Sequence, residues 1–209
     1  MGRSIRILAL GVLLAACQNT ASPPKPSPSP QLHNTALTAV LQPSEIPQSL
    51  SKCSSSGPIA AYIAALQGTD VALATRISDQ WQQLRAKGAV DAAISLFAYD
   101  PSACTAELAA TSKTKSVASF VAVFADEGQA ERAWGSDVLG FVTPAPDQLA
   151  PGLLRGTGTG LGPSSWTYIS TEVRLACWRR SVFLSLVVFT NLDSAAFKAV
   201  TAAIDARLN

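Results

Sequence analysis

The stretch from residue 166 to residue 178 holds aromatic and charged side chains at a spacing that could bind a ligand. If the alternation of a β-strand holds over residues 168–178, one carboxylate, one guanidinium and two aromatic rings share one face. Such a combination on one sheet face can form a ligand site. The competing interpretation is a surface ion pair with flanking aromatic side chains under a loop. The candidates for a ligand-binding face are Trp166, Tyr168, Glu172, Arg174 and Trp178.

A run of glycines at residues 156–162 invites comparison with nucleotide-binding loops. The dinucleotide fingerprint GxGxxG requires a third glycine where this sequence has Leu161 or Pro163. That fingerprint also opens a helix, whereas here a predicted strand follows the run. We therefore expect a flexible loop, with a flap or a backbone-lined pocket wall as the alternative, because glycine lets a ligand approach the main chain closely. The loop glycines are Gly156, Gly158, Gly160 and Gly162.

The sequence offers few residues for catalysis or metal binding. His33 is the only histidine and lies in a predicted spacer, which excludes histidine-based triads and metal sites within the domain. No CxxC pair or cysteine–histidine cluster occurs, so no zinc site is expected. Paired carboxylates could support a glycoside hydrolase, but helix caps and solvated helix faces account for Asp126, Glu127, Glu131 and Asp193. We expect no catalytic residue, no cofactor and no metal, with a carboxylate-based hydrolase as the least favoured alternative.

The N-terminus has the layout of a cleavable secretory signal. Arg3 and Arg6 precede an apolar run at residues 7–16. As a helix this run would be about 15 Å long, too short for a bilayer core of roughly 30 Å. It ends in the sequence LAAC, which resembles the lipobox of bacterial lipoproteins with Cys17 as the lipidated residue. The resemblance implies removal of residues 1–16, attachment of diacylglycerol to the Cys17 thiol, and a protein anchored outside the cytoplasm.

A spacer follows the predicted lipidation site. Residues 18–34 are rich in Pro, Ser and Asn, which favours an extended segment without a core of its own. At about 3.1 Å per residue, the spacer could hold a domain roughly 50 Å from the bilayer. The sequence thus divides into a signal peptide at 1–16, a lipidated cysteine and tether at 17–34, and a single globular domain at 35–209.

The mature chain is nearly neutral and has three further cysteines. Without Arg3 and Arg6, 14 basic residues remain from the 16 in the whole chain, against 14 acidic ones, so nucleic acid is not an expected partner. Disulfides persist outside the cytoplasm, so one bridge and one free thiol are expected. Cys53 and Cys104 lie in loop-like sequence and form the favoured pair, whereas Cys177 lies in an apolar strand. Pairing of Cys104 with Cys177 is the alternative.

The apolar patterns in the domain predict an α+β fold. Helices are expected near residues 59–66, 70–88, 126–138 and 193–208, and strands near 92–99, 117–125, 165–170, 172–178 and 182–190. Thr69 is expected to cap the second of these helices. Residues 119–134 match residues 185–200 in pattern, which suggests a repeated hairpin-plus-helix unit. We expect an antiparallel sheet of about five strands with helices packed on one face, and the long loop at 143–163, an apolar ligand or a partner covering the other.

The pattern over residues 117–208 resembles the extracellular sensor domains of mycobacterial Ser/Thr kinases and related small lipoproteins. The shared features are a strand that ends in Phe124, an Ala-rich helix, and a later hairpin with a closing helix. The chain departs from these domains at its cysteines, because they typically carry two disulfides. The resemblance implies a sensor or binding module of the cell envelope and transfers no site residue.

These observations favour a membrane-anchored lipoprotein that binds or senses a ligand. The expected partners are the membrane, through the lipid anchor, and a small apolar ligand or an envelope protein. The alternative is a structural or protein-interaction lipoprotein of the envelope, which requires an exposed apolar patch in place of a pocket.

Overall fold

The fold is taken from a computed structural model that describes residues 34–46, 49–101, 104, 114–135 and 137–208. These residues belong to one compact unit. Within it, no described helix has both the length and the apolar character needed to cross a bilayer. The signal sequence, Cys17 and the spacer with His33 lie outside the described residues, so the predictions for them stay predictions.

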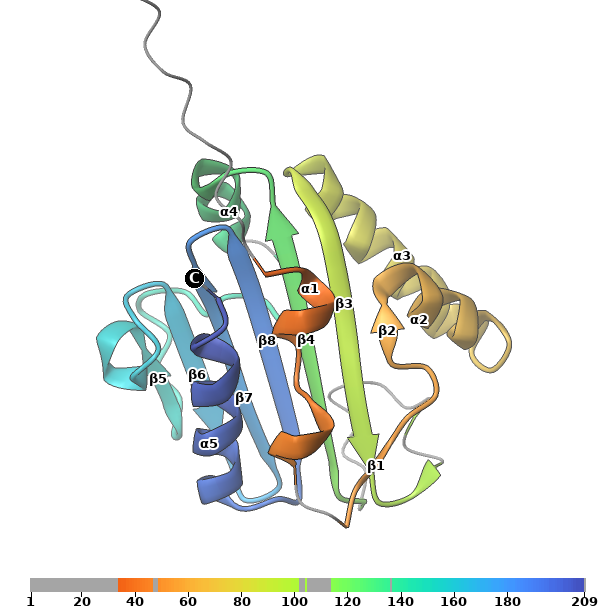
Figure 1. The fold of residues 1–209 in the computed structure, drawn as a ribbon. Helices are drawn as coiled ribbons and strands as arrows, with labels where there is room; N and C mark the ends of the chain where they lie inside the picture. The colour runs from red at the N-terminus through yellow and green to blue at the C-terminus, as the bar shows by residue number, and fades with distance from the viewer. Residues whose placement is uncertain (1–33, 47–48, 102–103, 105–113, 136, 209) are drawn as a thin grey trace, which may run out of the picture. The chain divides into compact units, whose positions relative to one another are not determined.

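The centre of the unit is one antiparallel sheet (Figure 1), in which the strands follow the order β1-β3-β4-β8-β7-β6-β5 and β2 also pairs with β3. The α+β class and the antiparallel sheet are as predicted, and the five predicted strands correspond to β3, β4, β6, β7 and β8. The count of five is too low, because three short strands lack a recognisable period. The strands are β1 (Ser51–Lys52), β2 (Gly57–Pro58), β3 (Ala89–Ala98), β4 (Ser116–Phe124), β5 (Leu153–Arg155), β6 (Ser165–Ile169), β7 (Val173–Arg180) and β8 (Phe183–Thr190).

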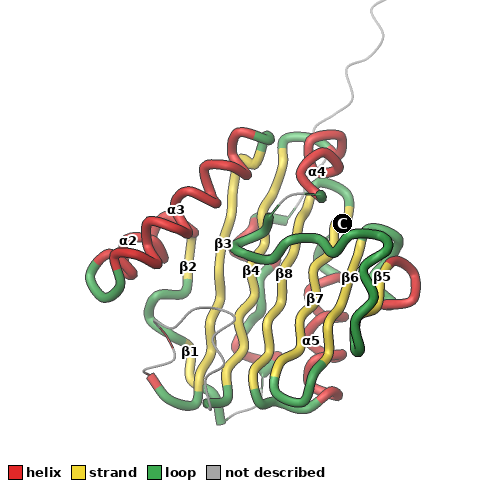
Figure 2. The backbone as a smooth tube through the Cα atoms, turned by 180° about the vertical axis from the view of Figure 1, so that it is seen from behind, coloured by secondary structure: helices red, strands yellow, loops and turns green. Residues whose placement is uncertain are grey.

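Helices cover both faces of the sheet, which corrects the expectation of one covered face. We call the side under α2, α3 and α4 the α3 face, and the side under α1 and α5 the α5 face (Figures 1 and 2). The helices are α1 (Ala36–Ala39), α2 (Ile59–Gln67), α3 (Val71–Ala86), α4 (Glu127–Trp134) and α5 (Ser194–Asp205). Two short 3-10 helices lie at Pro43–Glu45 and Gly156–Thr159.

The central strands explain why both faces need helices. Phe120 in β4 pairs with Leu186 in β8, and both side chains join the apolar layer of the α3 face. Their neighbours Val121 and Val187 point the other way, into the layer of the α5 face. Alternate residues of a strand point to opposite faces, so a strand that is apolar throughout must be covered twice. On the α3 face the loop before β5 also contributes cover, through residues 138–139 (Figure 2).

The repeated hairpin-plus-helix unit exists in chain order, but its helices diverge. β3, β4 and α4 follow one another as β7, β8 and α5 do, and the paired Phe120 and Leu186 are 66 residues apart. However, Ala130 of α4 lies in the layer of the α3 face, whereas Phe197 of α5 lies in that of the α5 face. The repeat therefore describes the strands and not the packing of the helices.

Aspartate side chains cap the N-termini of three helices. Asp70, Asp126 and Asp193 each accept a backbone N–H from the third residue of the helix that follows, over 2.9, 2.7 and 2.7 Å. This satisfies N–H groups that have no partner within the helix. Asp126 and Asp193 confirm the predicted caps, whereas α3 is capped by Asp70 and not by Thr69. The Thr69 hydroxyl instead donates to the carbonyl of Leu66 over 3.3 Å.

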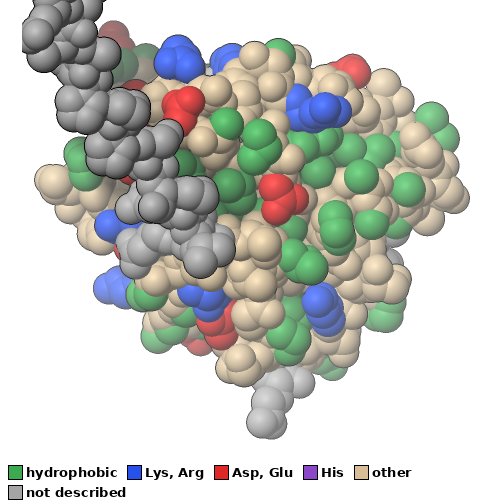
Figure 3. All heavy atoms as spheres, turned by 45° about the horizontal axis from the view of Figure 1, so that its top comes forward, with side chains coloured by type: hydrophobic (Ala, Val, Ile, Leu, Met, Phe, Trp, Pro, Cys, Tyr) green, Lys and Arg blue, Asp and Glu red, His purple; other side chains and the backbone are tan. Residues whose placement is uncertain are grey.

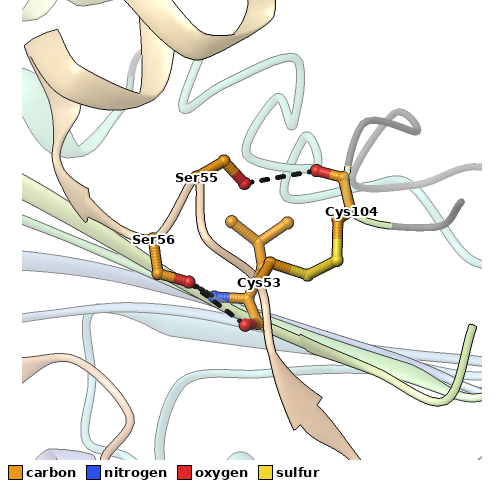
Figure 4. Close-up of a disulfide and its surroundings, with 5 residues drawn as sticks. Cys53, Ser55, Ser56 and Cys104 are labelled. Carbon is orange, nitrogen blue, oxygen red and sulfur yellow. Dashed lines mark hydrogen bonds between the residues drawn. A yellow bond between two sulfur atoms is a disulfide. The ribbon is translucent and has the colours of Figure 1, made fainter. Parts of the chain in front are cut away.

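The predicted Cys53–Cys104 disulfide is present, and Cys177 is free and buried. The bridge joins the segment after β1 to the segment after β3, with the two Cα atoms 5.5 Å apart (Figure 4). Beside it, the Ser55 hydroxyl donates to the carbonyl of Cys104 over 3.4 Å, and the backbone N–H of Cys53 donates to Leu96 over 2.9 Å. The bridge thus fastens the chain before α2 to the edge of the sheet.

We expect the double variant Cys53→Ala/Cys104→Ala to lose about 2–4 kcal/mol of unfolding free energy, because the bridge closes a long loop in the unfolded chain. Urea unfolding followed by circular dichroism measures this loss. Reduction of the wild-type protein with dithiothreitol should produce a loss of the same size. Equal stability of the oxidised wild type and the variant would contradict the structural role of the bridge.

Tyr62 of α2 makes the unfolding free energy of the domain fall as the pH rises above about 10. Its side chain is fully buried, its hydroxyl has no hydrogen-bond partner within the described residues, and burial raises its pKa to about 12. Between pH 10 and 12 the unfolded chain therefore loses a proton that the folded chain keeps, which lowers the unfolding free energy by about 1.4 kcal/mol per pH unit. The unfolding free energy of Tyr62→Phe should equal or exceed that of the wild type at pH 7. The difference in favour of the variant should grow above pH 10. Urea titrations at pH 7, 10.5 and 11.5 test this, and a difference independent of pH would refute it.

Candidate functional site

The five residues predicted to form a ligand-binding face do not lie together. Trp166 pairs with Cys177 and lies in the layer of the α3 face, where Tyr168 packs partly buried. Trp178 lies in the layer of the opposite, α5 face. Arg174 is on the same side as Trp178, because the two are separated by an even number of residues in β7. The sheet thus separates the aromatic groups that the sequence placed on one face.

The charged and aromatic groups of this stretch have structural partners. The Trp178 indole N–H donates to Asp205 over 3.0 Å, and the same carboxylate binds Arg180 through two contacts of 2.6 Å. The Arg174 guanidinium donates to the carbonyl of Leu192. Glu172 is exposed in the turn between β6 and β7. These contacts fasten α5 and the chain before it to β7, so they support the fold and do not assemble the predicted site.

The glycine run, for which a flexible loop was predicted, contains a hydrogen-bonded turn. Residues Gly156–Thr159 form a 3-10 helix, and the Thr159 hydroxyl donates to the carbonyl of Gly156 over 2.9 Å. The Ser165 hydroxyl lies 3.0 and 2.6 Å from the carbonyl oxygens of Gly156 and Gly162. Gly160 ends the turn in the left-handed region at φ 80°, which favours glycine. The two hydroxyl side chains thus hold the residues around Gly156, Gly158, Gly160 and Gly162.

The acidic residues considered for hydrolysis make the structural contacts expected of them. Besides the two helix caps, Glu131 forms an ion pair with Arg179 at 2.5 Å, and Glu127 accepts a hydrogen bond from Ser181 over 3.0 Å. In the part of the chain that the structure describes, no cluster of three His, Cys, Asp or Glu side chains could hold a metal ion.

A shallow depression between the ends of α3 and α4 is the best candidate site. It has a volume of about 420 Å³, and the described residues that line it include three basic side chains and no carboxylate. We call it the basic depression; it is lined by Arg85, Ala86, Lys87, Gly88, Gln129 and Arg132. Such a surface attracts an anion.

A tight turn brings the two walls of the basic depression together. Gly88 has φ +103°, which favours glycine and lets the chain reverse from α3 into β3. A Cβ atom at this position would lie 1.7 Å from Oε1 of Gln129, so the turn packs directly against α4. The Gly88 carbonyl also accepts the backbone N–H of Ala125 over 3.3 Å. The walls are therefore joined through main-chain and side-chain contacts, and a larger residue at Gly88 would have to displace the Gln129 side chain.

The basic side chains of the depression differ from those of the neighbouring hairpin. Arg179 and Arg180 are both held in ion pairs, with Glu131 and Asp205. Arg85 and Arg132 have no ion pair among the described residues, and each lies in the last turn of its helix. A cation there interacts favourably with the helix dipole, which is the structural explanation for these residues. Their convergence on one depression makes both guanidinium groups available to an anion.

The described chain begins at the same end of the sheet. The backbone N–H of Ala36 donates to the Asp91 carboxylate over 3.1 Å, and Asp91 lies three residues after Gly88. The Asn34 side chain donates to the carbonyl of Arg207 over 2.7 Å. The start of α1 is therefore held by Asp91 near the beginning of β3, and β3 follows directly after Gly88 of the basic depression.

A second, apolar surface lies at the β5 edge of the sheet. Leu149 is 93% exposed and Leu154 is 49% exposed, and both line a depression of about 410 Å³ together with Pro151. The Arg155 guanidinium donates to the carbonyls of Pro146 and Gln148 over 2.8 and 2.7 Å, which holds the loop beside β5. This surface could contact another protein.

Sequence reasoning missed the basic depression because its residues are distant in the chain. Arg85 and Lys87 precede Gly88, and Arg132 precedes Gly135, so each segment resembles an ordinary helix end with a basic residue or two. The only available signal was the repetition of this pattern. It becomes a site only when the two helix ends are known to meet.

Comparisons with known proteins give no information about the function, so a functional proposal depends on the geometry described above. No protein-family model, curated protein or solved structure matches the chain. The lipobox at Cys17 and the likeness to kinase sensor domains remain predictions from the sequence.

Proposed function

We propose that this protein is a membrane-anchored lipoprotein, displayed outside the cytoplasm, whose domain binds an anionic ligand at the basic depression. The observation that carries the proposal is the convergence on one depression of Arg85 and Arg132, neither of which has an ion pair among the described residues, beside Lys87. Guanidinium groups bind phosphate and carboxylate oxygens through paired, charge-assisted hydrogen bonds. The ligand class is therefore a phosphate or carboxylate group.

The cellular location is supported by two features that are independent of each other. The LAAC sequence ending at Cys17 has the lipobox pattern, and the apolar run before it is too short to span a membrane. The Cys53–Cys104 bridge is of the kind that persists in oxidising compartments. Both features favour a domain outside the cytoplasm.

A protein-interaction role is the second candidate. It is favoured by the nearly complete exposure of Leu149 and the half exposure of Leu154 beside Pro151 at the sheet edge. Exposed apolar side chains that share one depression are typical of contact surfaces. Substitution of Leu149 and Leu154 by serine would weaken a partner's binding without affecting the basic depression.

Cys17→Ser tests the anchor. We expect the variant to remain unprocessed or to be released, because serine provides no thiol for the lipid. Phase separation in Triton X-114, with the mass of the N-terminal peptide, measures this in cells that express the full chain. Asn19→Ser should be processed and should partition like the wild type. Normal processing and detergent-phase partitioning of Cys17→Ser would contradict the proposed anchor.

Arg85→Gln/Arg132→Gln tests the anion site. We expect the affinity for inorganic phosphate, followed by amide chemical shifts in residues 18–209, to fall at least about tenfold, because each charge-assisted hydrogen bond contributes roughly 1.5–3 kcal/mol. In the wild type, the largest shifts should surround Gly88 and Gln129. The control Lys52→Gln/Lys198→Gln removes the same charge from exposed positions outside the depression and should bind like the wild type. Equal loss in both double variants would refute a specific site.

A further inference from the structure

An apolar groove adjoins the basic depression and shares Arg85 with it. The groove has a volume of about 440 Å³ and runs between α2, α3 and the first residues of β3. Its lining is mainly apolar, with Ile59, Trp81 and Val90 as its largest apolar side chains. Its one carboxylate, Asp91, already accepts the backbone N–H of Ala36. A cationic surface and an apolar surface therefore meet at one arginine.

The edge of β3 is open beside this groove. β2 pairs only with Ala93 and Ile94 of β3, and the β3–β4 register shifts between Ala89 and Asp91. Val90 lies in this bulge, two residues after Gly88, and is 64% exposed. Leu37, on the helix that begins beside Asp91, is 48% exposed. Exposed Val90 thus lines the same groove as Arg85, and Figure 3 shows a face of the domain on which hydrophobic side chains have basic and acidic ones among them.

A basic surface beside an apolar one is complementary to an anionic amphiphile, which is a molecule with a negatively charged head and an apolar part. Surface binding to a membrane takes its free energy from buried apolar area and from attraction between basic residues and anionic headgroups. The basic depression accepts a phosphate group, and the groove beside Trp81 and Val90 accepts the apolar part of the same molecule. A soluble anion would use only the first of these surfaces.

We propose that this end of the domain docks on the anionic lipids of the membrane that holds the anchor, with phosphate headgroups in the basic depression and Val90 inserted among the acyl chains. The proposal rests on the proposed function, because it needs the lipid anchor; the spacer ends at Asn34, and the described chain enters the fold at this end. The extended spacer would let the domain reach the bilayer, and docking would then fix its orientation on the surface.

The test uses residues 18–209 without lipid and vesicles of phosphatidylglycerol and phosphatidylcholine, with flotation as the measurement. We expect binding that requires phosphatidylglycerol. Arg85→Gln/Arg132→Gln should lower the partition coefficient about 30-fold, since each basic residue near the surface contributes about one kcal/mol. Val90→Ser should lower it several-fold without affecting phosphate binding, which separates insertion from charge. Circular dichroism checks that each variant is folded.

Three outcomes would overturn the docking proposal. The first is equal loss in Lys52→Gln/Lys198→Gln, which would show that binding follows net charge alone. The second is binding of inorganic phosphate without vesicle binding, in which case the anion site survives and docking fails. The third is binding of monomeric dihexanoyl phosphatidylglycerol without vesicle binding, which would indicate a soluble amphiphile. If the protein binds neither inorganic phosphate, nor the monomeric lipid, nor the vesicles, the proposed function is refuted as well.

Discussion

The structure depends on the burial of β4 and β8 on both faces. Phe120 and Val121 are neighbours in β4 that point to opposite sides, and each is at most 1% exposed; Leu186 and Val187 repeat this in β8. Apolar surface of this kind must be removed from water on each side, at roughly 25 cal/mol for every Å². The chain meets this requirement by packing three helices on one face and two on the other. Helix placement is therefore set by the central strands and not by a repeated unit.

The same constraint explains where the basic depression lies. β3 and β4 are antiparallel neighbours, and Ala89 at the start of β3 pairs with Phe124 at the end of β4. The helix that leads into β3 must end where the helix that follows β4 begins. Both helices lie on the α3 face, so α3 and α4 meet across the turn at Gly88. Arg85 and Lys87 at the end of α3 are thereby brought to one surface with Gln129 and Arg132 of α4.

The sequence predicted the elements better than their arrangement. Long apolar runs with β-branched residues located β4 and β8, and aspartates before Ala-rich segments located the starts of α4 and α5. The Cys53–Cys104 bridge could be predicted because both cysteines lie in loop-like sequence. The two- and three-residue strands could not, since a period of two needs at least four residues to be recognised. The side of the sheet that each helix covers depends on contacts between residues far apart in sequence.

The predicted ligand face failed for a geometric reason that is specific to hairpins. In the β6–β7 hairpin, Tyr168 pairs with Leu175, and directly paired residues share a face. Arg174 therefore lies on the face opposite to Tyr168, although the two residues are six positions apart. Alternation counted through a turn is valid only when the turn preserves the register. The exposed turn residue Glu172 belongs to neither face.

A shallow site is compatible with the proposed binding role because of the anchor. A lipid and a spacer of roughly 50 Å would confine the domain to a thin layer above the bilayer. Confinement of this kind gives an effective ligand concentration in the millimolar range, about that of a short flexible linkage. The basic depression, with exposed Val90 in the neighbouring groove, then needs only weak intrinsic affinity to be occupied. An enclosed cavity is unnecessary for a ligand that the proposed anchor would keep nearby.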